Sequence, residues 1–173
     1  GFSEWFTIDP AYSPSFKGNP PGRYVNGALS PFTAGELAKG AFECGEEAYG
    51  WDILDRVAQM VKRDDGKLYF LYDPVTGQPQ GGGPSAWGAA ALLSAVDEGL
   101  AGIVNAGFGY DEIAFSPRWP VTPYRELRYV TGYESVGRYV DCRYVQTDEG
   151  FRYHLRRHLT GTSSFMFRTE KLR

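Results

Sequence analysis

Histidine and cysteine are scarce in this sequence of 173 residues, which contains two of each. His154 and His158 lie four residues apart on one expected strand, and no third metal ligand accompanies them. Both are far from any marked nucleophile, so the sequence does not support a Ser-His-Asp or Cys-His arrangement. Cys44 and Cys142 fall on different expected elements and indicate neither a disulfide nor a compartment. We expect no metal and no cofactor.

Nucleotide motifs, membrane spans and a basic excess are also missing. The apolar run that begins near residue 86 has Asp97 and Glu98 near its end and is rich in alanine and glycine, which makes it a poor membrane span. The glycine triplet at residues 81–83 lacks a preceding hydrophobic strand and a Lys-Ser or Lys-Thr pair, so we interpret it as a hinge. The net charge is −3, and the arginines of the second half are spread over alternating strands, which disfavours nucleic-acid binding.

The sequence has no basic-then-apolar signal segment and does not begin with Met. We therefore expect a mature or trimmed product, or a fragment of a longer protein. Its length suits one domain, or a small helical unit joined to a β unit. Aromatic residues make up 16%, including 12 Tyr and 4 Trp. Such a content suits stacking against sugars, although core packing and β-sheet surfaces are its more ordinary explanation.

Helical signals dominate the first half of the chain. Ser30 or Thr33 starts one helix, and Thr33 and Glu36 have the spacing of a capping box. A second helix is expected from about residue 46 to 62, and together the two form a helical hairpin. Its apolar stripe comprises Trp51, Leu54, Val57, Ala58 and Val61.

A third helix begins near Ser85 and continues to about residue 96 without any charged residue. Because Ser94 is its one polar residue from 86 to 96, no face is left for solvent, and we expect this helix to be buried on all sides. Two other helices cannot surround it. We therefore expect another chain, self-association, a sheet or a larger helical assembly to cover residues 86–96.

The last third of the chain alternates apolar and polar residues in short runs, which is typical of antiparallel strands. The sequence thus predicts an α+β protein with an aromatic-rich loop segment at residues 1–29, helical hairpins at 30–110 and an antiparallel β extension at 111–173. The expected strands are residues 112–116, 126–131, 138–147, 151–159 and 164–169.

Five short motifs, taken in order, resemble the C-terminal end of six-hairpin glycosidases. The likeness is to the last two hairpins of an (α/α)6 toroid, as in glucosidase and mannosylglycerate-hydrolase relatives, followed by an antiparallel β-sheet or sandwich. It covers residues 24–120 and implies a carbohydrate-active protein with a pocket lined by loops at the helix starts. The motifs are YVNGALSP (24–31), YDPVTGQP (72–79), WGAAA (87–91), EGLAGI (98–103) and FSPRWP (115–120).

The sequence also contains a candidate site, and the resemblance implies which of its residues face a sugar. Hydrolysis of a glycosidic bond needs two carboxylates, for which Glu36 and Asp73 are the candidates. Each has a structural alternative, since Glu36 completes the capping box and Asp73 suits the cap of its own turn. Trp87 is equally explained as a core aromatic residue. The expected carbohydrate-binding residues are Tyr24, Asn26, Tyr72 and Trp87.

Phe70 departs from the family pattern, because several relatives carry a catalytic base glutamate at this position, four residues before the proline of the Tyr-Asp-Pro turn. Their general acid usually comes from an earlier hairpin. The resemblance therefore implies a C-terminal portion of a glycoside hydrolase that is incomplete as this chain alone. The alternatives are a non-catalytic module that binds glycans or proteins through exposed aromatics, and a structural oligomer that hides residues 86–96.

Overall fold

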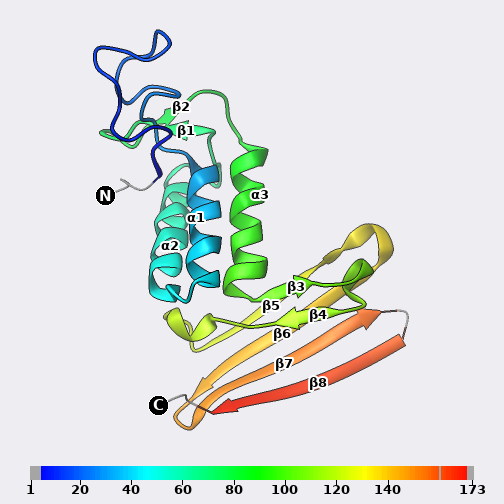
Figure 1. The fold of residues 1–173 in the computed structure, drawn as a ribbon. Coiled ribbons are helices and arrows are strands. Elements are labelled where there is room, and N and C mark those ends of the chain that lie inside the picture. Colours follow the sequence, from blue (N-terminus) through cyan, green and yellow to red (C-terminus); the bar gives the residue numbers. More distant parts are fainter. Residues whose placement is uncertain (1–4, 160, 171–173) are drawn as a thin grey trace. The chain divides into compact units, whose positions relative to one another are not determined.

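The computed structural model describes residues 5–159 and 161–170 and divides the chain into two compact units, Gly1–Val96 and Asp97–Arg173 (Figure 1). The first unit carries the α-helices and the second carries the longer strands, so the protein is of mixed α+β class. The division falls earlier than residue 111, where we expected the β extension to begin. The reason is that β3 (Ile103–Asn105) pairs with β4 (Ile113–Phe115) and so belongs with the strands.

The helical hairpin consists of α1 (Pro31–Glu43) and α2 (Glu47–Arg63). Ser30 is the N-cap of α1, because its hydroxyl accepts a hydrogen bond of 3.4 Å from the backbone N–H of Thr33. Thr33 thus lies inside the first turn, and the capping box expected with Glu36 is wrong.

The buried face of α2 differs in part from the expected stripe. Leu54 and Val57 are buried, as expected, whereas Ala58 is exposed and Trp51 is only half-buried. The face that meets α1 instead includes Gly50, where a Cβ atom would lie 3.0 Å from the ring of Phe42. The close approach of α1 at this glycine turns the helix so that its buried residues are Gly50, Ile53, Leu54, Val57 and Met60.

The third helix, α3 (Ala86–Ser94), begins at the expected N-cap, Ser85, whose hydroxyl accepts from the backbone N–H of Gly88 at 3.2 Å. It lies parallel to α1, since contacts occur in the same order along both helices. The Phe32 and Trp87 rings are 5.9 Å apart at the starts, and Lys39 Nζ donates to Ser94 Oγ at 3.3 Å near the ends. Both helix starts lie at the end of the unit that carries β1 and β2 (Figure 1).

Within this chain residues 86–96 are not buried on all sides, so their covering by another chain, by self-association or by a larger helical assembly stays a prediction. Trp87 is 69% exposed and Leu93 is 61% exposed, whereas Gly88, Ala91 and Ala95 are buried. The reason is that α3 packs along α1 on one side, which leaves the opposite side to solvent. The helix then continues into a π-helical turn, Ala95–Leu100.

A loop layer covers the helix starts. Its short strands β1 (Leu71–Tyr72) and β2 (Pro79–Gln80) pair in antiparallel register. Leu29 bridges both Phe6 and Tyr72, and this ties the segment before α1 to β1. Trp5 is fully buried. The described part of the aromatic-rich segment, residues 5–29, is therefore ordered within the helical unit.

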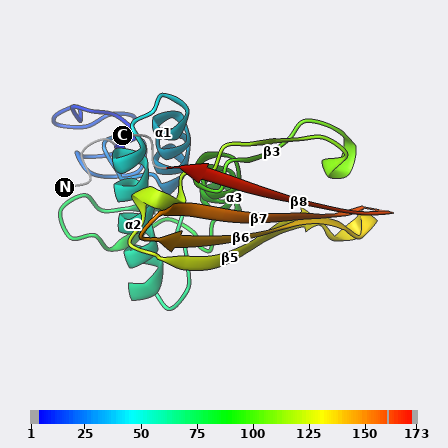
Figure 2. The same ribbon diagram turned by 90° about the horizontal axis from the view of Figure 1, so that it is seen from below.

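The second unit contains the hairpin β3–β4 and a four-stranded antiparallel sheet in the order β5-β6-β7-β8, which forms one twisted layer (Figure 2). Alternation along β6 buries Val140, Cys142 and Tyr144. The expected antiparallel strands are confirmed, and several extend one to three residues further. The sheet strands are β5 (Glu126–Tyr133), β6 (Arg138–Thr147), β7 (Gly150–Leu159) and β8 (Gly161–Glu170).

Both cysteines are free thiols. Cys44 is exposed, whereas burial raises the pKa of the Cys142 thiol to about 12, which keeps it protonated and unreactive at neutral pH. Across the part of the chain that the structure describes, no helix has the length and apolar character needed to cross a bilayer.

Candidate functional site

Four aromatic side chains form a row where the loop layer meets the helix starts. Phe32 comes from the first turn of α1, Trp87 from the first turn of α3, Phe70 from the residue before β1, and Tyr24 from the preceding loop. The ring centroids lie 6.4 Å apart for Tyr24 and Phe70, 6.4 Å for Phe70 and Trp87, and 5.9 Å for Trp87 and Phe32. Tyr24, Phe32 and Trp87 are exposed and Phe70 is half-buried. We call these four residues the aromatic surface.

Gln80 fixes the Tyr24 end of the aromatic surface. Its amide Nε2 donates to the carbonyl of Gly22 at 2.8 Å and to Oδ2 of Asp73 at 3.3 Å, and its Oε1 accepts from the Tyr24 backbone N–H at 3.4 Å. The loop that carries Tyr24 is therefore bonded to β2 on both sides of Arg23. Such bonding fixes the backbone from which the Tyr24 ring projects, so less freedom of this loop is lost on binding a ligand.

Two of the four expected carbohydrate-binding residues, Tyr24 and Trp87, lie in the aromatic surface. The other two, Asn26 and Tyr72, are fully buried and present no surface to a ligand. The Asn26 carboxamide is engaged by the loop before it, because it accepts from Tyr12 N at 2.7 Å and donates to Tyr12 O and Asn19 O at 2.8 and 2.9 Å. The Tyr72 hydroxyl accepts from the Tyr69 N–H at 3.0 Å, and burial raises the pKa of Tyr72. Both residues therefore organise the loop layer.

The two candidate carboxylates have different surroundings. Asp73 Oδ1 accepts hydrogen bonds of 2.9 Å from the backbone N–H groups of Val75 and Thr76, so Asp73 caps its own turn. The Thr76 N–H, followed by that of Val75, lowers the pKa of Asp73, which makes it a poor proton donor at neutral pH. Glu36 is exposed on α1, one turn beyond Phe32 and on the same side of the helix.

Asp73→Ala is expected to destabilise the helical unit at neutral pH and much less in acid. The two N–H groups bond the ionised carboxylate, so the folded pKa is lower than the unfolded one. The resulting stability is complete above about pH 4, the ordinary carboxyl pKa, and is lost as the pH falls through the folded pKa. Urea unfolding at pH 7 and pH 3, followed by circular dichroism, measures the difference from wild type. Asp73→Asn, which keeps an acceptor oxygen, serves as the matched variant, and an equal loss at both pH values would contradict this account.

A hollow of about 410 Å³ lies in the same unit, lined mainly by proline, aliphatic and glycine residues. Its lining includes Phe6, Ile8, Pro21 and Pro74, and Asp9 supplies a carboxylate. Neither Glu36 nor Asp73 lines this hollow. The loop layer thus offers an apolar depression, without the two expected carboxylates facing each other across it.

In the second unit, the Asp97 carboxylate belongs to a side-chain cluster with Tyr129 and Trp119 that the sequence did not predict. The Tyr129 hydroxyl of β5 donates a very short hydrogen bond to Asp97 Oδ1, and the Tyr129 ring packs 5.7 Å from that of Trp119. Burial, together with the bond to Asp97, raises the pKa of Tyr129. The phenol therefore stays protonated, and its O–H group remains hydrogen-bonded to the Asp97 carboxylate. The two residues are 32 positions apart, and no local motif marks their contact.

In the described residues, 5–159 and 161–170, no group of three or more His, Cys, Asp or Glu side chains is placed to hold a metal ion. The ring of His158 stacks on Tyr139 with centroids 3.9 Å apart, and His154 is exposed. The histidines are thus part of the sheet surface.

Comparison with known proteins gave no match. No protein-family model fits the chain, and no characterised protein or solved structure matches it. Among the features of the two units, the aromatic surface is the one that best suits a ligand.

Proposed function

We propose that the helical unit binds carbohydrate through the aromatic surface, as the C-terminal portion of a glycoside hydrolase that is completed by another chain or by a longer parent protein. The observation that carries the proposal is the row of aromatic rings from Tyr24 to Phe32. The C–H groups on the face of a pyranose ring carry partial positive charge and pack well against the negative face of an aromatic ring. A row of rings suits a ligand with repeated pyranose units.

The exposure of the rings supports this proposal. A tryptophan that is 69% exposed leaves a large apolar area in water, and its removal from water favours binding. Neighbouring rings are separated by 5.9 to 6.4 Å, so one oligosaccharide can contact several of them. The Gln80 amide is engaged by Gly22, Asp73 and the Tyr24 backbone N–H, and so holds the loop that presents the Tyr24 ring. Such an apolar platform is suited to the apolar face of a neutral glycan.

Two further features support ancestry in a hydrolase. The resemblance to six-hairpin glycosidases implies a pocket lined by loops at helix starts, and the aromatic surface lies at the starts of α1 and α3, which are parallel. Glu36 is exposed on the same side of α1 as Phe32, whereas Asp73 is held by its turn. Of the two candidate carboxylates only Glu36 is thus available, and one is too few for either glycosidase mechanism, because both need a pair about 5 to 9.5 Å apart. The second carboxylate would come from the completing part.

A second role is contact with another chain or a second copy of this one. Leu93, near the end of α3, is 61% exposed, and Ala90 beside it is exposed as well. Such a partner would cover the later turns of α3, while Trp87 in the first turn stays with the aromatic surface. Light scattering of the purified chain distinguishes a monomer from an oligomer that covers this side of α3.

Tyr24→Ala is expected to weaken carbohydrate binding about threefold to tenfold, since one ring of the row is lost. Isothermal titration calorimetry with neutral gluco- and manno-oligosaccharides measures the affinity. Tyr12→Ala is the matched control, because Tyr12 is 58% exposed against 51% for Tyr24 but stacks on Phe16 outside the row. Reducing-sugar release by this chain alone should not exceed the blank.

Two outcomes would count against this function. An equal loss of affinity in the Tyr24 and Tyr12 variants would assign binding to the loop in general. Failure of every neutral oligosaccharide to bind the wild-type chain would remove the carbohydrate proposal and leave contact with another chain as the better account of the exposed residues on α3.

A further inference from the structure

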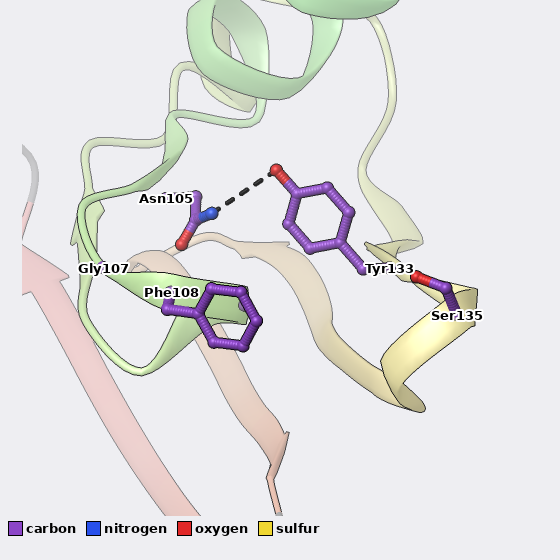
Figure 3. Close-up of a pocket in the computed structure, with 6 residues that line it drawn as sticks. Asn105, Gly107, Phe108, Tyr133 and Ser135 are labelled. Atoms are coloured by element: carbon purple, nitrogen blue, oxygen red, sulfur yellow. Dashed lines mark hydrogen bonds between the residues drawn. The ribbon is translucent and has the colours of Figure 1, made fainter.

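A separate pocket of about 280 Å³ lies in the second unit (Figure 3). It forms between two chain segments, the connection from β3 to β4 and the end of β5 with the turn that follows it. Figure 3 shows Asn105 beside the hydroxyl end of Tyr133, Ser135 near the other end of that side chain, and the ring of Phe108 across from them. The lining residues are Asn105, Gly107, Phe108, Gly109, Tyr133 and Ser135.

Hydrogen bonds hold the Asn105 side of the pocket. Asn105 Oδ1 accepts from the Tyr110 backbone N–H at 2.9 Å, and its Nδ2 donates to the Tyr133 hydroxyl at 3.4 Å. The Tyr133 ring also packs against that of Tyr110, with centroids 5.4 Å apart, and the Tyr110 hydroxyl bonds Thr131 at 3.2 Å. The amide and the Tyr133 ring are thus positioned before any ligand arrives.

Arg138 supports the Phe108 side. Its guanidinium lies over the Phe108 ring at 5.6 Å, donates to the Phe108 carbonyl at 3.0 Å and forms an ion pair of 2.8 Å with Asp111. The turn that carries Phe108 favours glycine at position 109, because the φ of Gly109, +56°, lies in the left-handed region. Because the charge of Arg138 is paired with Asp111, it does not make the pocket selective for anions.

The lining groups define the chemistry of a ligand. Tyr133 Oη accepts from Asn105, so its own O–H proton remains free to donate, and the exposed Ser135 hydroxyl can donate or accept. Phe108 and Tyr133 supply exposed ring faces. None of the described lining residues is charged. The pocket therefore suits a neutral ligand with an apolar face and hydroxyl groups at its edge.

We propose that this pocket binds one neutral pyranose unit, either a free monosaccharide or the terminal residue of a glycan. Its volume of about 280 Å³ lies at the small end of ligand sites, which suits one ring inside the pocket. The uncharged lining disfavours uronic acids and phosphorylated sugars, which would lose hydration without gaining a counter-charge. The pocket uses residues of the second unit alone, so this inference does not depend on carbohydrate binding by the aromatic surface.

The test uses the full chain with Trp87→Ala as background, so that binding at the aromatic surface is weakened, and the amide signals assign any remaining binding to its unit. Glucose, mannose and galactose are titrated separately and followed by two-dimensional amide NMR. At least one sugar is expected to shift the signals of residues 105–110 and 133–135. Tyr133→Phe, which removes one hydroxyl without changing shape, should weaken that binding at least threefold, and Phe108→Ala should weaken it at least tenfold. Tyr124→Phe changes an exposed tyrosine outside the pocket and is the matched control.

The affinity for a short oligosaccharide is then compared with the affinity for its free terminal monosaccharide. Binding of the oligosaccharide that is at least tenfold tighter would identify a glycan end as the ligand. Equal affinities would identify the free monosaccharide. Stronger binding of glucuronate or of indole than of any neutral sugar would overturn the proposal. So would the absence of shifts in the pocket signals, or shifts that persist unchanged in the Tyr133 and Phe108 variants.

Discussion

Trp87→Ala is expected to lower the affinity of the chain for neutral oligosaccharides at least tenfold, which corresponds to about 1.4 kcal/mol. Trp87 lies between Phe32 and Phe70 in the aromatic surface and is 69% exposed, so its ring offers the largest area to a sugar face. Large, exposed aromatic side chains at the centre of a contact commonly carry most of the binding energy. The same position makes this variant the most sensitive probe of the proposed function.

The fold should survive this substitution. Most of the Trp87 side chain is already in water, and the contacts with Phe32 and Phe70 are worth about 1 kcal/mol each. Calorimetric titration gives the affinity, and far-ultraviolet circular dichroism confirms the helices. Leu93→Ala is the control, since Leu93 is 61% exposed on the same helix and lies outside the aromatic surface. It should leave sugar affinity unchanged.

Two outcomes would contradict this account of Trp87. Unfolding of the Trp87 variant would give the residue a structural role, as a core aromatic. A similar loss of affinity in the Trp87 and Leu93 variants would mean that the whole exposed side of α3 binds a ligand or partner, and that the row of rings has no special part.

Local signals in the sequence predicted the secondary structure well. Ser30 and Ser85 are N-caps because a short hydroxyl side chain can bond the free N–H groups of a first turn, a property visible without tertiary structure. Alternation in residues 126–159 predicted strands for the same reason, since side chains of a strand point to opposite faces. The capping box failed because Thr33 and Glu36 have the right spacing but Ser30 precedes them and bonds first.

The site was harder to predict, because it depends on contacts between distant segments. Asn26 and Tyr72 were expected to meet a sugar, but the sequence does not show that the Asn26 amide bonds residues 7 and 14 positions earlier. Phe70 was noted for the glutamate it replaces, and its ring contacts with Tyr24 and Trp87 emerge only in the fold. The pocket beside Phe108 and Tyr133 likewise joins segments 25 residues apart in the chain.

The exposed side of α3 illustrates a different limit of the sequence. The absence of charge in residues 86–96 correctly marked a helix with unusual apolar content, but pattern alone cannot count the neighbours that a chain provides. Here α1 supplies one side, and Leu93 and Trp87 remain exposed. The same apolar pattern therefore fits burial by a partner and stacking against a ligand, and the Trp87 and Leu93 variants separate the two.

Gly35→Ala is expected to destabilise the helical unit by about 2 kcal/mol, a large effect for one methyl group. A Cβ atom at residue 35 would lie 2.6 Å from the carbonyl carbon of Ala91 and 2.7 Å from its Cβ, so α1 and α3 would have to separate. Forced overpacking of this kind costs up to about 3 kcal/mol, and the better helix propensity of alanine offsets about 1 kcal/mol. Urea unfolding followed at 222 nm reports this loss, because the described α-helices all lie in the first unit.

Gly40→Ala provides a control in the same helix with the opposite expected sign. A Cβ atom there would meet nothing within 4 Å, so only helix propensity changes, and the variant should be stabilised by about 0.5 to 1 kcal/mol. The pair also tests the aromatic surface, because separating α1 from α3 at Gly35 would move Phe32 away from Trp87. Gly35→Ala should therefore weaken oligosaccharide binding while Gly40→Ala leaves it unchanged. Equal stability changes of the same sign would contradict the close parallel packing of α1 and α3.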